Sequence, residues 1–96
     1  MPALMTSTIR VKDREKLQDY LQQVKALGAQ YGAEMLFSGP AQGPIAGDQD
    51  HDLVVIVRFP TTEDIDALFG SEAYAPLLDL REAAADMVIL KYQDAA

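Results

Sequence analysis

His51 is the only histidine in the sequence, and it lies between two acidic residues, Asp50 and Asp52. Neighbouring carboxylates favour a protonated imidazole, and histidine is the side chain best suited to proton transfer near neutral pH. We therefore take His51 and Asp52 as candidate catalytic residues, an acid–base group with an orienting carboxylate. The alternative is a loop histidine that is simply solvated among acidic residues.

Asp48 adds a third aspartate to this segment, so the loop also contains residue types that bind metal ions. Strong metal sites need ligands at spacings that the fold holds fixed, which close neighbours in a loop do not provide. A single loop histidine is also a poor axial ligand for haem. The sequence therefore predicts no metal site and indicates no cofactor.

Arg10 and Arg58 each lie within a segment that has the pattern of a β-strand. Side-chain alternation places both on the face that also carries Thr8. Guanidinium groups bind carboxylates through paired hydrogen bonds, so these three residues are candidates for binding a substrate carboxylate. Structural alternatives compete: Arg10 can neutralise the acids around His51, and threonine is a common strand residue.

The strands that must position these residues follow from side-chain alternation and from the turn residues between them. The pattern predicts four strands, at residues 3–11, 34–38, 53–59 and 87–92. Glycine and proline recur between the second and third of these strands, and we expect an irregular connection there.

Apolar residues at helical spacing predict a long helix that Asp13 can cap and Gly32 can end. Thr61 can cap a shorter helix, which Gly70 interrupts. Pro76 suits the first turn of a further helical segment.

The resulting order, β-α-β-β-α-β, predicts an α+β, ferredoxin-like domain over residues 1–96. Right-handed crossovers give a four-stranded antiparallel sheet of strand order 4-1-3-2, with the helices on one face. The first and third strands then run antiparallel as neighbours. This arrangement brings Arg10, at the end of the first, to the loop that carries His51.

The second and third strands should form a hairpin whose register follows from alternation. If Leu36 lies opposite Ile56, Glu34 lies opposite Arg58. The sequence therefore predicts an ion pair between Glu34 and Arg58 as the structural alternative to ligand binding by Arg58.

Composition excludes several classes of function. The chain has a net charge of −7 with only eight basic residues, which argues against nucleic acids and anionic membranes. It has no cysteine, and therefore no disulfide or catalytic thiolate. The start of the sequence lacks the pattern of a signal peptide, and no apolar run is long enough to span a bilayer. We expect a cytoplasmic protein.

The predicted sheet has apolar residues on both faces, although helices cover only one. Val54 and Ile56 lie on the uncovered face of the third strand, and Val88, Leu90 and Tyr92 on that of the fourth. Covering this surface is worth several kcal/mol at about 25 cal/mol per Å². We expect a homodimer in which a second sheet covers the first, the alternative being a monomer with a partly apolar face.

Several short motifs resemble the DUF1330 family, whose usual run is an apolar strand ending in Phe-Pro, a Ser-x-x-Tyr turn and a helix with Leu-Arg. The matching residues here are 52–60, 71–74 and 77–81, and Tyr31-Gly32-Ala33 and Gly47-Asp48 also fit. The likeness spans nearly the whole chain and is strongest from residue 52 to 90.

This resemblance implies the dimeric α+β barrel fold, in which the sheets of two copies close face to face. That superfamily includes cofactor-independent monooxygenases, lactone isomerases and haem-degrading enzymes, whereas DUF1330 itself has no established activity. Tyr74 and Arg81 match family positions and are further candidates for substrate binding. The sequence departs from the family at Arg58, where an acidic residue is common, and at Gln49, where an aromatic residue usually follows Gly-Asp.

Two functional hypotheses remain. The first is a cofactor-independent enzyme that acts on a small acidic or aromatic molecule, in a pocket between sheet and helices or at the barrel mouth. The second is a non-catalytic module for ligand binding or assembly. His51 inside an apolar pocket would favour the enzyme, and an exposed His51 with a filled barrel would favour the module.

Overall fold

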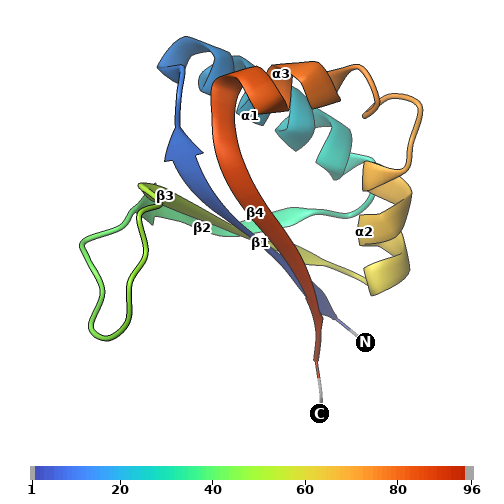
Figure 1. Ribbon diagram of the computed structural model, residues 1–96. Helices are drawn as coiled ribbons and strands as arrows, with labels where there is room; N and C mark the ends of the chain where they lie inside the picture. Colours follow the sequence, from blue (N-terminus) through green and yellow to red (C-terminus); the bar gives the residue numbers. More distant parts are fainter. Residues whose placement is uncertain (1, 95–96) are drawn as a thin grey trace.

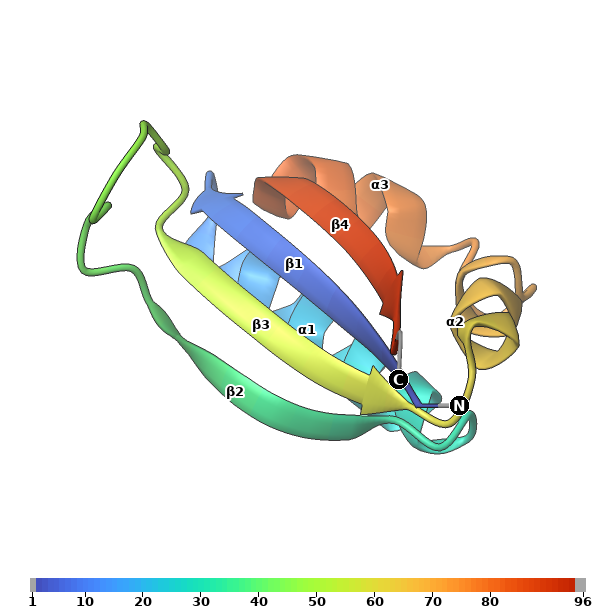
Figure 2. The ribbon, with the colours of Figure 1, turned by 90° about the horizontal axis from the view of Figure 1, so that it is seen from below.

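The computed structural model describes residues 2–94 of the chain, which form one sheet with helices on one of its faces (Figure 1). The elements in chain order are β1 (Ala3–Val11), α1 (Arg14–Ala29), β2 (Glu34–Pro40), β3 (Leu53–Phe59), α2 (Thr62–Phe69), α3 (Leu77–Ala84) and β4 (Ala85–Gln93). The strands are antiparallel in the order β2-β3-β1-β4, which confirms the predicted topology. Figure 2 shows the face of the sheet that no helix covers.

The predicted capping residues begin the first two helices. The Asp13 carboxylate accepts a hydrogen bond from the backbone N–H of Lys16 at 3.1 Å, and the Thr61 hydroxyl accepts one from Asp64 at 3.2 Å. Each satisfies a backbone donor that has no partner within its helix. Gly32 follows α1 with a φ of 79°, a left-handed conformation that favours glycine.

Gly32→Ala is expected to lower the free energy of unfolding by about 2 kcal/mol or more, because two costs add. Alanine is strained at this φ, and its Cβ would lie 2.8 Å from Cγ of Pro60. Gly47 has the same φ of 79° with no atom within 4 Å of a built Cβ, so Gly47→Ala is the matched control. Urea denaturation measures both. Equal losses in the two variants would show that the Pro60 contact adds nothing.

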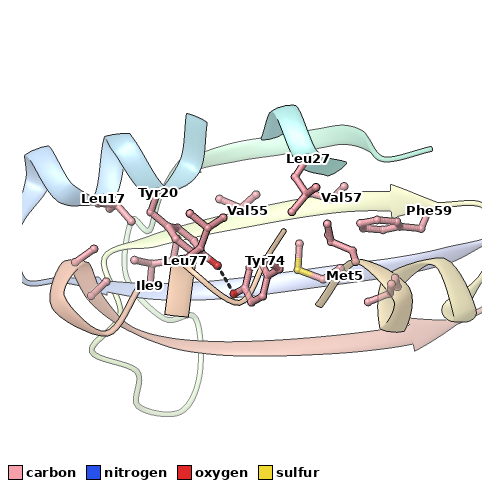
Figure 3. Close-up of a cluster of buried hydrophobic side chains, with 14 of the residues drawn as sticks. Met5, Ile9, Leu17, Tyr20, Leu27, Val55, Val57, Phe59, Tyr74 and Leu77 are labelled. Carbon is pink, nitrogen blue, oxygen red and sulfur yellow. Dashed lines mark hydrogen bonds between the residues drawn. The ribbon is translucent and has the colours of Figure 1, made fainter. Parts of the chain in front are cut away.

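The core lies between the helices and one sheet face, hereafter the inner face. Met5 and Ile9 of β1, Val55 and Val57 of β3 and Tyr20 of α1 are all buried there. Figure 3 shows Tyr20 and Leu27 pointing from α1 towards these strands. The period-two pattern of the strands therefore positions the core as expected.

The β2–β3 hairpin confirms one predicted pair and corrects another. Glu34 lies opposite Arg58, but the residue opposite Ile56 is Phe37 rather than Leu36. A register irregularity between Met35 and Phe37 inserts one extra residue into β2, as a β-bulge does. The shift places the Phe37 ring on the uncovered face, 3.0 Å from where a Cβ of Gly39 would be. The ring thus occupies space that Gly39 leaves empty.

The uncovered sheet face, hereafter the outer face, is broadly apolar. Cross-strand pairs join Leu4 to Tyr92, Thr8 to Val88 and Phe37 to Ile56 across the four strands. The exposed large residues on this face are Leu4, Phe37, Val88, Leu90 and Tyr92. Large exposed apolar patches often mark interaction sites, so this face is a candidate interface.

Candidate ligand-binding site

A cavity of about 520 Å³ lies between α1 and the inner face of the sheet. Its walls are mostly apolar, and its size falls within the usual range for small-molecule sites. Its lining comes from β1, α1, β2, β3, α2 and β4, and includes Met5, Val24, Met35, Val55, Phe59, Phe69 and Ile89. The sequence hypothesis of a pocket between sheet and helices therefore has a physical counterpart.

The helix α1 packs against α3, and the cavity lies between α1 and the sheet, where Met35 and Ser38 of β2 also line it. Gly28 and Ala33 both line the cavity and approach each other closely, because a Cβ built on Gly28 would lie 3.2 Å from Cβ of Ala33. Met35 lies on the inner face, opposite Val57, and is nevertheless exposed. An uncovered apolar side chain on the inner face indicates that the layers do not close at this edge.

Two polar side chains are buried within the lining. Ser7 of β1 is 6% exposed, and its Oγ has no hydrogen-bond partner among the described residues. Burying a hydroxyl without a hydrogen-bond partner lowers folding stability by about 1–3 kcal/mol. A ligand atom that forms a hydrogen bond with this hydroxyl would recover part of that loss. The second is Tyr20 of α1, which is also buried and also lines the cavity.

Tyr20 is the end of a chain of three hydrogen-bonded side chains. Its Oη lies 2.7 Å from Oη of Tyr74, the pair drawn with a dashed line in Figure 3. Arg81 of α3 in turn donates from Nη1 to Oη of Tyr74 at 3.0 Å. Phe69 packs edge-on against Tyr74, with ring centroids 4.9 Å apart. Burial raises the pKa of Tyr20, so its phenol stays protonated.

The remaining predicted site residues lie on the outer face, away from this cavity. His51 is largely buried, with 15% of its side chain exposed, and its Nδ1 lies 2.9 Å from Oγ1 of Thr8. Asp50, rather than Asp52, approaches the ring, with Oδ1 3.8 Å from Nε2. Asp52 instead accepts a hydrogen bond from the backbone N–H of Val11 at 3.0 Å. The proposed catalytic role of His51 and Asp52 stays a prediction.

Arg10 reaches the His51 loop, as the strand order predicts. Its guanidinium donates to Asp50 at 2.8 Å and to Asp86 of β4. Two carboxylates thus neutralise the charge of Arg10, which favours the structural alternative for this residue.

Arg58 lies near the opposite end of the sheet, paired in register with Leu4 and Glu34. Within residues 2–94, no hydrogen bond or ion pair joins the side chains of Glu34 and Arg58.

The hydrogen bond from Arg10, with the charge of Lys12 adding to it, holds the pKa of Asp86 below its ordinary value of 3.8. Because the pKa of Asp86 is lower in the folded protein than in the unfolded chain, the ion pair stabilises the fold at pH values above 3.8. This stabilisation is lost as the pH falls through the lowered pKa of the folded protein. We expect Arg10→Gln to raise the pKa of Asp86 back towards 3.8, as a carboxyl-carbon NMR titration would measure. Lys12→Gln, which leaves the Arg10 contact intact, should raise it less. An unchanged pKa in Arg10→Gln would contradict this assignment.

The structure therefore separates the predicted site residues into three places. Thr8, Arg10, His51 and Asp52 gather at one end of the outer face. Arg58 lies near the other end of the sheet, and Tyr74 and Arg81 are hydrogen-bonded to each other on the helix side. In residues 2–94, no group of three or more histidines, aspartates or glutamates is arranged to hold a metal ion. Across the same residues, no helix is long and apolar enough to cross a membrane.

Ser7 and Tyr20 are the residues that sequence reasoning missed. Ser7 gave a signal that could have been used, because it is a polar residue between Met5 and Ile9 on the apolar face of its strand. Tyr20 gave none, because a tyrosine at helical spacing is the ordinary pattern of a buried helix face.

Residues 2–93 match a family model described as a domain of unknown function, DUF1330. Comparison with curated proteins found no match. A protein of unknown function from Rhodopseudomonas palustris has a similar structure, with a TM-score of 0.83 at 18% identity over 99% of this chain and 83% of that one.

Two further solved structures share the fold. A dimeric ferredoxin-like protein of unknown function from Jannaschia sp. CCS1 has a TM-score of 0.77 at 8% identity, covering 98% of this chain and 100% of that one. SnoaB, a cofactor-independent oxygenase from Streptomyces nogalater, has a TM-score of 0.72 at 9% identity, covering 99% and 94%. At these identities the likeness shows a shared fold and no shared activity.

Proposed function

Because this chain belongs to the DUF1330 family, which is defined as a domain of unknown function, we propose a function from the geometry of its cavity. The cavity beneath α1 binds a small, mainly apolar organic molecule. The observation that carries the proposal is an apolar space of about 520 Å³ whose wall includes Ser7, with a buried Oγ that has no hydrogen-bond partner among the described residues. Apolar walls with few polar groups are typical of small-molecule sites.

Both earlier hypotheses use this cavity. A cofactor-independent enzyme would act on the bound molecule, and a non-catalytic module would only hold it. The fold shared with SnoaB, a cofactor-independent oxygenase, supports catalysis by analogy alone. His51 does not line the cavity, so an enzyme of this design would use Tyr20 and Ser7 in its place.

We further propose that the protein is a homodimer assembled through the outer face. Solved structures of the same fold are described as dimeric. The outer face has exposed apolar residues on β1, β2 and β4 and partly buried ones, Val54 and Ile56, on β3. An identical sheet can cover this apolar face. The cavity lies on the opposite side of the sheet and therefore stays open to ligands in such a dimer.

Cavity binding is tested by titrating 2-naphthol into the protein in a calorimeter. Val24 lines the cavity, and we expect Val24→Phe to weaken binding about tenfold or more, since the added ring occupies the space that a ligand needs. Gln18→Phe adds a ring to an exposed position of the same helix and is the matched control. Equal affinities for the two variants would show that 2-naphthol binds elsewhere.

A further inference from the structure

The direction of the hydrogen bonds around Tyr74 can be assigned from the partners that each group has. A guanidinium can only donate, so Oη of Tyr74 accepts from Arg81. Tyr74 is 1% exposed, and the only other side-chain partner of its hydroxyl in residues 2–94 is Oη of Tyr20. The Tyr74 hydroxyl therefore donates its hydrogen bond to Oη of Tyr20.

The reverse assignment would leave a buried proton without a partner. If Tyr20 donated to Tyr74, the Tyr74 oxygen would accept twice and its own proton would point at no acceptor. Buried donors are almost always satisfied in folded proteins. Either assignment leaves one phenol proton without a protein acceptor among the described residues. With Tyr74 as donor, that proton belongs to Tyr20, which lines the cavity and can meet a ligand or water there, whereas the reverse assignment would leave it on Tyr74, which does not line the cavity.

The free proton belongs to the residue that lines the cavity. Tyr20 contributes to the cavity wall, whereas Tyr74 and Arg81 lie behind it. Ser7 contributes a second buried hydroxyl, with no partner in the described part of the chain. The polar groups buried in the cavity wall are thus two hydroxyls that can donate.

The charges around the cavity are positive, although the chain as a whole is acidic. Among the described residues in the wall, Lys25 is the one charged side chain, and none is a carboxylate. Arg81 stands behind the two phenols, and its Nη2 lies 3.4 Å from Glu82, whose side chain is 71% exposed. An exposed carboxylate offsets a partly buried charge only weakly. Since the Tyr20 phenol stays protonated, it adds no negative charge of its own.

We infer that Tyr20 donates its hydroxyl proton to an oxygen of the ligand and that the cavity prefers ligands whose oxygen carries negative charge, such as a phenolate or an enolate. This inference rests on the proposed use of the cavity. Tyr20 is the binding residue, and Tyr74 and Arg81 are positioning residues that orient and polarise its hydroxyl. Hydrogen bonds to a charged oxygen are stronger than those to a neutral one, so the cavity is expected to bind the anionic form of a ligand more tightly than its neutral form.

The test uses 4-nitrophenol, whose phenolate absorbs visible light, titrated with pH in the presence of excess protein. Wild-type protein is expected to lower the apparent pKa of the bound probe, with a preference for the phenolate of about tenfold. Tyr20→Phe should remove most of this preference while 2-naphthol still binds. Tyr31→Phe removes a hydroxyl that does not line the cavity and should leave the preference unchanged.

Arg81→Met gives a second test that leaves both phenols in place, and it should also reduce the preference. Ser7→Ala should raise the thermal stability of the free protein, because it removes a buried unpartnered hydroxyl, and should weaken probe binding. If both probes bind but wild-type and Tyr20→Phe give the same probe pKa, the inference is wrong and the cavity proposal stands. If neither probe binds to the wild-type protein, both fail together.

Discussion

Ile56→Asp is expected to convert the protein from a dimer to a monomer at micromolar concentration. Ile56 lies on the outer face between Thr6 of β1 and Phe37 of β2. A two-fold interface carries each substitution twice, so two carboxylates would be buried without partners. At about 2 kcal/mol for each buried polar group, the dissociation constant rises by about a thousandfold. Analytical ultracentrifugation across a concentration series measures it.

Two variants separate a lost interface from a general effect. Ile56→Leu keeps an apolar side chain and should stay dimeric. Gln18→Asp adds the same charge at an exposed position of α1, so it controls for the increase in net charge. A wild-type mass near 10.5 kDa at every concentration would rule out the dimer.

Tyr74→Ala is expected to cost about 3–5 kcal/mol of folding stability, the usual price of removing a buried aromatic ring. Tyr74 is 1% exposed, contacts the rings of Phe69 and Tyr20, and holds the Arg81 guanidinium. A domain of this size has a total stability of about 5–15 kcal/mol, so the loss should be visible as a much lower melting temperature.

Tyr74→Phe isolates the hydroxyl from the ring. It leaves Arg81 without its phenol partner and is expected to cost about 1–3 kcal/mol. Tyr31→Phe removes the same atom from a partly buried side chain outside this hydrogen-bonded chain and should change stability by less than about 0.5 kcal/mol. Denaturant melts compare the three variants. A Tyr74→Phe protein as stable as the wild type would show that the hydrogen-bonded chain contributes nothing to the fold.

The topology was predictable because each strand repeats its pattern over several residues and because connections follow strong geometric rules. The bulge in β2 was not predictable, since Met35, Leu36 and Phe37 are all large and apolar and any register buries some of them. Only the structure shows that Phe37 turns to the outer face, opposite Ile56.

The site was harder to predict than the fold. A pattern of apolar residues tells which side of a helix or strand faces inward, but it does not tell how far apart the two layers stand. The cavity arises from the space left between α1 and the inner face of the sheet. Sequence reasoning turned instead to His51, because titratable residues are conspicuous in a sequence and an unpartnered serine is not.

The central claim is that the cavity beneath α1, rather than the His51 end of the outer face, is the ligand site. Methyl and histidine NMR spectra recorded during a titration with 2-naphthol test it directly. We predict that the methyl signals of Val24, Ala33 and Val55, which line the cavity, will shift in a saturable manner. Shifts confined to the Thr8 methyl group and the His51 ring protons, with the cavity methyls unchanged, would contradict the account.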